Sequence, residues 1–300
     1  SILAESVGRH DRRLGLVDAP GGMHALSKRK KLALHRRRKV EGVQVHDGTA
    51  LLLADPALHQ YGTWLLKHAP KIGFIEHFGL PDSKVVVPVG VPSKHVDLIE
   101  ALGVPRTHIV FQYPDEISQF ERLAVPPKPY VFRRGLGGNP FRVFGVAESA
   151  PDTRQPRGRR LYVSRRGNPR RALRNEERVE DVFRAHGFDI VRPERLSVAE
   201  TLGAFSNCSF VAGPSGSGLF NVLFARRTFS ALMLVPPQQK FDGVHLMLCD
   251  ICAGKGGSVG YIFGRMIDDR RQATGEALDY SWEIDEARLD GLLSNLVAER

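Results

Sequence analysis

A chain of 300 residues, 42% of them hydrophobic, can build two domains that each have a core. A net charge of +10 indicates an anionic partner without identifying the anion, and the sequence contains no run of about 20 apolar residues that could form a transmembrane helix. Three cysteines exclude a disulfide framework and favour a reducing compartment. We therefore expect a cytoplasmic protein, with a peripheral position on a membrane as the alternative.

The positive charge is clustered in two arginine- and lysine-rich blocks, 28–39 and 157–174. Solvated loops, or contact with an acidic membrane surface, explain the first block. Nucleic acid is not expected as a partner, because aromatic residues that could stack on bases are not interleaved with either block.

Strands and helices alternate in the N-terminal half of the chain. The predicted strands are 50–54, 85–89 and 107–111, and the helices between them are 61–78, interrupted at Pro70, and 93–102. This alternation predicts one Rossmann-like domain over residues 1–150. A stretch rich in proline, glycine and arginine, 151–158, is the predicted linker to the next domain.

The alternation is more regular from Arg160 onward. The predicted strands are 161–164, 188–191, 208–212 and 231–235. Between them lie helices with capping signals at Asn175 and at Ser197, and a closing helix follows at 285–297. Such a pattern predicts a parallel sheet with right-handed crossovers. We assign residues 151–300 to a nucleotide-binding, Rossmann-like domain.

The third of these strands runs into a loop of glycines and serines at 213–218. Ligands of parallel sheets bind beyond the carboxyl ends of the strands, and glycines there let the backbone approach a ligand closely. The free N–H groups of the helix that starts at Leu219 favour an anion. We expect side chains added at Gly216 or Gly218 to project toward the ligand, and Asn221 to point into the same cleft.

Two arginines, Arg165 and Arg166, stand at the equivalent end of the first strand in this half. Arginine presents a planar fork of donors that matches the oxygens of a phosphate. Because side chains alternate along a strand, the two arginines face opposite sides. We expect Arg165 to make the stronger phosphate contact.

Three other motifs are excluded by their spacing. The loop 213–218 reads G-x-x-G-x-G instead of the dinucleotide fingerprint, the serine at 217 breaks the nucleophile-elbow pattern, and the residues around Lys255 are not those of a P-loop. Cys249 and Cys252 form a CxxC without a second pair, so we expect two partly buried thiols and no metal site.

Taken together, these segments resemble glycosyltransferase family 61, which includes bacterial capsular-polysaccharide enzymes and plant and animal protein or xylan glycosyltransferases. The stretches that carry the resemblance, in their order along the chain, are 161–166, 174–177, 187–188, 193–197 and 213–224. The N-terminal half is similar more loosely, through the segment 59–71 that contains Trp64, and the closing helix also fits.

The resemblance implies a GT-B-like α/β fold, with two Rossmann-like domains facing across a cleft. It also implies an inverting glycosyltransferase that needs no metal ion or other cofactor and moves a sugar from a nucleotide-sugar donor, UDP-linked, to a glycan or glycosylated acceptor. The donor-binding residues that it implies are Arg165, Arg166, Asn175, Glu176, Glu194, Ser215, Gly216, Ser217, Gly218 and Asn221.

Two departures from the family pattern bear on catalysis. The family usually has histidine where this chain has Thr63, and it favours histidine and alanine where Ser215 and Ser217 stand. A threonine cannot accept a proton near neutral pH, so the general base becomes His59, ahead of Asp55 and Glu76. An ordinary helix-start histidine is the alternative reading of His59. A catalytically inactive nucleotide-sugar-binding protein and a basic nucleic-acid-binding protein stay open as alternative functions.

Overall fold

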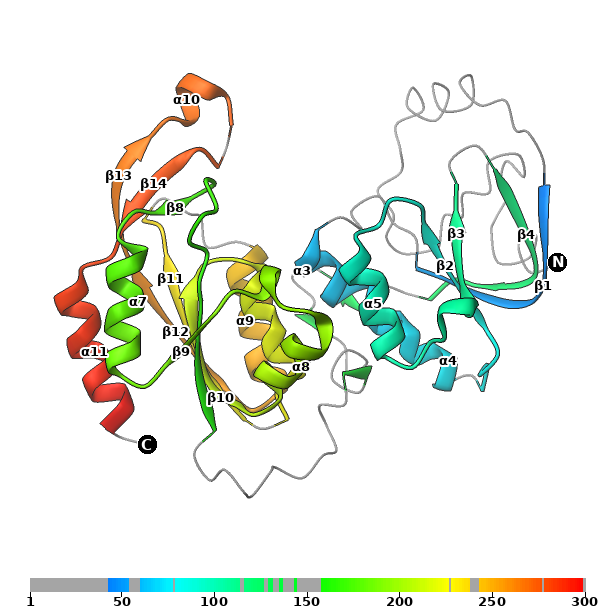
Figure 1. The fold of residues 1–300 in the computed structure, drawn as a ribbon, viewed down its shortest axis with the longest axis horizontal. Coiled ribbons are helices and arrows are strands. Elements are labelled where there is room, and N and C mark those ends of the chain that lie inside the picture. Colours follow the sequence, from blue (N-terminus) through cyan, green and yellow to red (C-terminus); the bar gives the residue numbers. More distant parts are fainter. Residues whose placement is uncertain are drawn as a thin grey trace. The chain divides into compact units, whose positions relative to one another are not determined.

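The computed structural model describes residues 43–53, 60–77, 79–113, 116–126, 129–131, 135–136, 143–144, 158–226, 228–237, 243–276 and 278–298. Contacts divide the chain into two compact units, Ser1–Pro129 and Tyr130–Arg300. Both units are mixed α/β structures built on parallel sheets (Figure 1). Within the ranges given above, no helix is both long enough and apolar enough to cross a membrane.

The first unit contains a four-stranded parallel sheet in the order β3-β2-β1-β4. Its strands are β1 (Val43–Leu52), β2 (Lys84–Pro88), β3 (Ile109–Gln112) and β4 (Ile117–Ala124), and α5 (Ser93–Ala101) connects β2 to β3. The three predicted strands are confirmed, but β1 begins earlier than expected and a 3-10 turn occupies 106–108. The sequence does not predict β4, because Phe120 is its only buried side chain and the strand lacks an apolar run.

The predicted helix 61–78 is present as a helical segment that changes type along its length. It consists of α3 (Tyr61–Thr63), a π-helix (Trp64–His68), a 3-10 helix (Ala69–Ile72) and α4 (Gly73–His77). Pro70 explains the irregularity, because it has no N–H for the carbonyl of Leu66 and its ring would clash with that carbonyl in a regular α-helix.

The second unit is built on a five-stranded parallel sheet in the order β12-β11-β10-β7-β9. The strands are β7 (Arg159–Val163), β9 (Asp189–Val191), β10 (Cys208–Pro214), β11 (Ser230–Val235) and β12 (Ser258–Phe263). The helices are α7 (Glu176–Ala185), α8 (Val198–Ser206), a 3-10 helix (Ser217–Phe224), α9 (Gly243–Gly254) and α11 (Glu286–Ala298). The alternation of strands and helices predicted for this half is confirmed.

The direction in which the sheet grows reverses between β7 and β10. The chain enters at β7 and adds β9 on one side. It then crosses to β10 on the other side of β7 and continues outward to β11 and β12. Ala212 of β10 pairs with Tyr162 of β7, so the carboxyl ends of the two strands lie next to each other.

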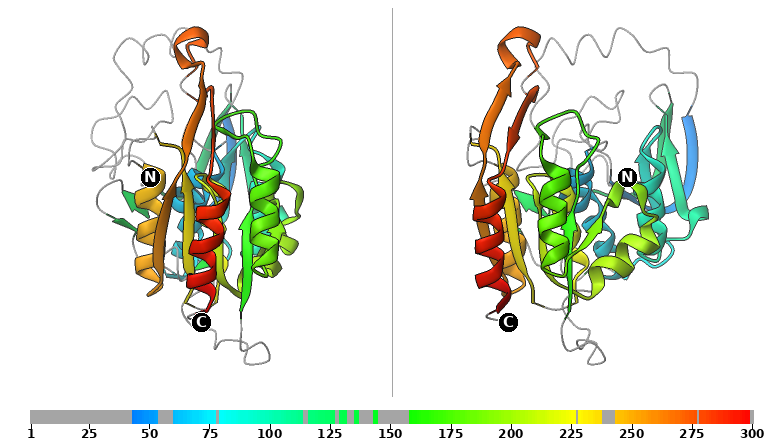
Figure 2. Two further views of the ribbon diagram at one scale, coloured as in Figure 1. Left: turned by 90° about the vertical axis from the view of Figure 1, so that its left-hand side faces the viewer. Right: turned by 60° about the vertical axis from the view of Figure 1, so that its left-hand side comes forward.

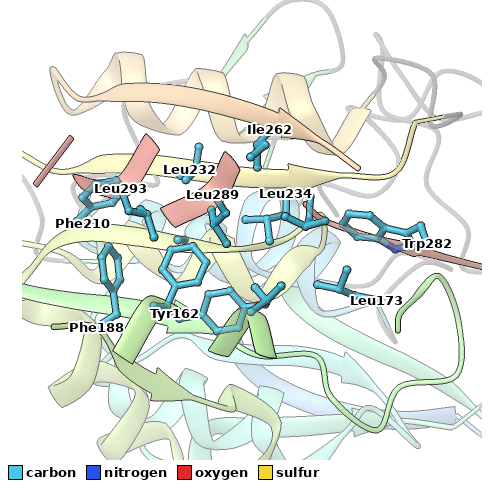
Figure 3. Close-up of a cluster of buried hydrophobic side chains, with 14 of the residues drawn as sticks. Tyr162, Leu173, Phe188, Phe210, Leu232, Leu234, Ile262, Trp282, Leu289 and Leu293 are labelled. Atoms are coloured by element: carbon cyan, nitrogen blue, oxygen red, sulfur yellow. The ribbon is translucent and has the colours of Figure 1, made fainter. Parts of the chain in front are cut away.

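The main core of this unit lies between the sheet and the helices α7 and α11, which are side by side (Figures 1 and 2). Its fully buried members include Tyr162 of β7, Trp282, and Leu289 and Leu293 of α11 (Figure 3), together with Phe183 of α7. The cluster fixes the position of α7 over the end of β7.

A small second sheet adjoins the carboxyl end of β12. It has the order β13-β14-β8 and consists of β13 (Arg265–Asp269), β14 (Tyr280–Glu283) and β8 (Ala172–Leu173), with α10 (Arg271–Thr274) between β13 and β14. Figure 2 shows β13 and β14 extending past the five-stranded sheet. Because β8 belongs to it, this sheet anchors the far end of the loop that leaves β7.

Candidate functional site

The candidate site lies where the strand order reverses in the second unit. In doubly wound sheets such a point leaves a crevice beyond the carboxyl ends of two neighbouring strands, and ligands bind there. Here β7 leads into Ser164, Arg165 and Arg166, while β10 leads into Ser215 and Gly216. The predicted arginine pair and the predicted glycine loop are therefore neighbours in space.

Arg165 connects the two strand ends. Its Nη1 donates a hydrogen bond to the carbonyl oxygen of Ser215 at 3.3 Å, and its Nη2 donates to the carbonyl oxygen of Arg170 at 3.5 Å. No carboxylate of the described residues lies within ion-pair distance of its guanidinium. Burial, and then the charge of Arg171, lower the pKa of Arg165 to about 10. The group stays charged at neutral pH in surroundings that penalise that charge, so a bound anion would relieve the penalty.

Arg166 has different surroundings. Its Nη1 donates to Glu177 Oε1 at 2.6 Å, and its Nη2 lies 3.6 Å from Glu180 Oε2. The guanidinium thus contacts the carboxylates of α7 and not the glycine loop. We therefore expect Arg166, although adjacent to Arg165 in sequence, to attract an anion less strongly than Arg165 does.

The loop after β10 is more regular than the sequence predicts. β10 continues through Pro214, Ser215 N donates to Leu234 O at 2.8 Å, and a 3-10 helix begins at Ser217, two residues before the expected start. The side chain of Ser215 is buried, and among the described residues nothing accepts from or donates to its Oγ. A buried hydroxyl without a partner costs about 1–3 kcal/mol, which a ligand oxygen at this position would recover.

The two glycines of the loop face protein atoms. A Cβ at Gly218 would lie 2.9 Å from Val163 Cγ1, and a Cβ at Gly216 would overlap Nη1 of Arg165. The expectation that side chains here project toward the ligand is therefore wrong for Gly218, whose added atoms would enter the core under β7. At Gly216 they would displace the guanidinium that points at the loop.

Two asparagines expected in the donor site serve the fold instead. Asn221 is fully buried, and its Nδ2 donates to Gly218 O at 2.8 Å, so the expectation that it points into a ligand cleft is wrong. Asn175 precedes α7 but makes no side-chain cap. Its Nδ2 donates to Ile284 O and to Glu286 Oε1, both at 2.7 Å, and its Oδ1 accepts from Ile284 N at 3.2 Å.

The two glutamates predicted for the site differ in exposure. Glu176, the first residue of α7, is buried, and its Oε1 accepts from the backbone N–H of Arg165 at 2.6 Å. Glu194 is exposed in the 3-10 helix Pro193–Arg195 beyond β9. The negative charges of Glu176 and then of Glu194 raise the pKa of Arg165, opposing the effect of burial. Ser217 is half-buried at the start of its helix.

Sequence reasoning missed Arg171 and Glu180. Arg171 has a φ of 54° and its backbone is held between Leu278 and Trp282, so its charge is fixed close enough to Arg165 to affect that residue's pKa. Glu180 is fully buried and its Oε1 accepts from Ser164 Oγ at 2.7 Å. The spacing of Glu176 and Glu180, one helical turn apart, is the signal that could have identified the second carboxylate.

In the first unit, the catalytic candidates are only partly placed. Thr63 is half-buried, and its Oγ1 donates to Gln60 Oε1 at 3.2 Å. The next residue, Trp64, is fully buried and stacks on His95 with ring centroids 5.0 Å apart. His59 and Asp55 lie outside the described residues, and Glu76 is exposed on α4.

The thiols of the CxxC are free, with Cys252 buried and Cys249 half-buried at 2.8 Å from the hydroxyl of Tyr261. A search for three or more clustered histidine, cysteine, aspartate or glutamate side chains finds none within the described ranges.

The geometry can be compared with known families. The model of the family described as Glycosyltransferase 61 matches residues 61–232, which is more than half of the chain. The matched range extends from α3 through the end of β7 and the glycine loop into β11. A search of curated proteins finds no match for this chain.

Proposed function

We propose, on the premise that this chain belongs to the glycosyltransferase 61 family and is therefore a glycosyltransferase, that the β7–β10 crevice binds a nucleotide-sugar donor. We propose a UDP-linked donor, a glycan or glycosylated acceptor, and transfer with inversion at the anomeric carbon. We further propose that the reaction takes place in the cytoplasm, with a membrane surface as the alternative location.

The observation that carries this proposal is the guanidinium of Arg165, which forms no ion pair with a described carboxylate and lies next to the loop where the buried hydroxyl of Ser215 has no partner among the described residues. Phosphate oxygens can accept from both groups, and charge-assisted bonds of this kind are roughly twice as strong as neutral ones. In sugar transfer the nucleoside diphosphate leaves with increasing negative charge. A guanidinium fixed at that position stabilises the departing group more than the intact donor.

The exposed carboxylate of Glu194 fits a second part of the donor. It lies just beyond the carboxyl end of β9, the second strand along the chain in the five-stranded sheet, where an acidic side chain in doubly wound folds accepts hydrogen bonds from ribose hydroxyls. We propose that Glu194 binds the ribose of the donor.

Acceptor activation is assigned to the first unit. A general base must lie within hydrogen-bond reach of the acceptor hydroxyl and have a pKa near the working pH. Thr63 lacks such a pKa, and its hydroxyl already donates to Gln60. We propose His59 as the base, and a GT-B arrangement in which the two units face each other across the donor and acceptor sites.

Two measurements on the same preparation test the proposal. A panel of nucleotide sugars should raise the melting temperature for at least one donor, because a ligand that binds only the folded state stabilises it. Turnover of that donor should persist in EDTA, since arginines and helix N–H groups supply the positive charge. Binding without turnover would identify a catalytically inactive donor-binding protein. Activity that is lost in EDTA and restored by Mn²⁺ would contradict the metal-independent mechanism.

The Gly216→Ala variant is expected to lose donor affinity while keeping its fold. The new methyl group displaces the guanidinium of Arg165, which is the mobile end of a long side chain, so the backbone need not shift. We expect UDP to bind roughly 10-fold more weakly, as measured by titration calorimetry, with an unchanged circular dichroism spectrum.

The matched control is Gly218→Ala. Its methyl group meets Val163 Cγ1 in the core, so the expected result is a lower melting temperature with the affinity of the folded fraction for UDP retained. If Gly216→Ala bound UDP as tightly as the wild type, the position assigned to the phosphates would be wrong.

A further inference from the structure

Two buried carboxylates lie one helical turn apart on α7 and face the end of β7. Glu176 accepts from the backbone N–H of Arg165 at 2.6 Å and from the hydroxyl of Tyr162 at 3.4 Å. Glu180 accepts from Ser164 Oγ at 2.7 Å and from Arg192 Nη2 at 3.4 Å, and Arg184 pairs with its second oxygen. The two glutamates thus hold consecutive residues at the end of one strand.

The carboxylate of Glu176 binds a backbone N–H just beyond the end of β7. Ser164, just after the end of β7, donates its N–H to Val191 O of β9 at 2.9 Å. The next N–H, that of Arg165, donates to a side chain, Oε1 of Glu176. This bond sets the direction in which the chain leaves β7, and therefore where the side chain of Arg165 begins.

Glu176 contacts the main chain of Arg165 and leaves the guanidinium to the other side of the crevice, where it donates to Ser215 O. An ion pair to the guanidinium would have neutralised the charge that a phosphate needs. A carboxylate on the backbone N–H fixes the residue and keeps its charge available. Direct contact between Glu176 and the donor is also disfavoured, because the carboxylate would repel a diphosphate next to it.

We infer that Glu176 is a positioning residue for the phosphate subsite, which acts on the donor only through the placement of Arg165. The inference rests on the proposed function and replaces the direct donor contact that the sequence suggests for this residue. Burial raises the pKa of Glu176, and its two donors hold the carboxylate in place.

A double-mutant cycle with Arg165→Ala and Glu176→Ala tests the inference, with UDP and unphosphorylated uridine as the two probes. Glu176→Ala removes the acceptor of the Arg165 N–H, so alone it should weaken UDP binding about tenfold and leave uridine binding unchanged. In the Arg165→Ala background the same substitution should cause no further loss of UDP affinity, because the effects of two residues that act through one group are not additive. The variant at Glu176 should change KM and kcat in the same proportion as Arg165→Ala does.

The control is Glu177→Ala, which removes an exposed carboxylate in the same helical turn that pairs with Arg166 and should leave UDP binding unchanged. Effects of Arg165→Ala and Glu176→Ala that multiply, or an equal loss of uridine binding, would overturn the positioning role. If Glu176→Ala does not fold, Glu176→Asp, whose shorter side chain withdraws the carboxylate, enters the same cycle. Failure of the wild type itself to bind UDP would instead count against the proposed function.

Discussion

Arg165→Ala is expected to weaken UDP binding by about 1.5–3 kcal/mol, or roughly 10- to 100-fold. The guanidinium reaches from the end of β7 to the loop after β10, and none of the described carboxylates forms an ion pair with it. Its removal takes away a charged donor without breaking an ion pair, and the backbone N–H of Arg165 still donates to Glu176, so the loss should fall mainly on the ligand. Titration calorimetry with UDP measures the effect.

Arg166→Ala is the matched control. Its guanidinium already contacts Glu177 and Glu180 on α7, so the variant should keep donor affinity within about threefold of the wild type. Equal losses for the two variants would mean that both arginines bind the phosphates. An unchanged affinity in Arg165→Ala would place the donor elsewhere.

Gly213→Ala is expected to cost about 2–3 kcal/mol of folding free energy. Gly213 lies in β10, between β7 and β11, and a Cβ there would be 2.6 Å from the carbonyl oxygen of Val163. That oxygen belongs to the backbone of the neighbouring strand and cannot move aside as a side chain could. Urea unfolding followed by circular dichroism should show a lower midpoint.

Gly203→Ala provides the comparison, because the same change is made at a helical glycine in α8 with open space around it. Here alanine should stabilise the protein by about 0.5–1 kcal/mol. A Gly213→Ala variant as stable as the wild type would show that β7 and β10 can separate at the site, contrary to the close approach described above.

The sequence predicts the fold best where strands are buried on both faces. All six residues of β11 are buried, and an apolar run of that kind is readable without knowledge of its neighbours. β4 buries only Phe120 and carries no comparable signal. The first half of β1 is mostly exposed, and its pairing with β4 is interrupted by a register shift between His46 and Thr49.

For the site, predictability depends on how far apart the interacting residues are in the chain. The capping box of Ser197 and Glu200 is confirmed, because both partners lie within three residues. Asn175 carries an equally good capping signal, but its side chain bonds to Ile284 and Glu286, more than 100 residues away. A sequence pattern identifies such a residue as polar without saying which of its neighbours in space it will bind.

The bonds of Asn175 also join the last helix of the chain to the residue next to Glu176. They bind both side-chain atoms of a buried amide to the backbone of Ile284, immediately before α11 begins. A shortened version of this unit that stopped before Ile284 would remove the hydrogen-bond partners of the Asn175 amide. It would also remove α11, which packs beside α7. The smallest piece able to hold Arg165 in place is thus set by its tertiary contacts and must extend through α11, about eighty residues past the glycine loop.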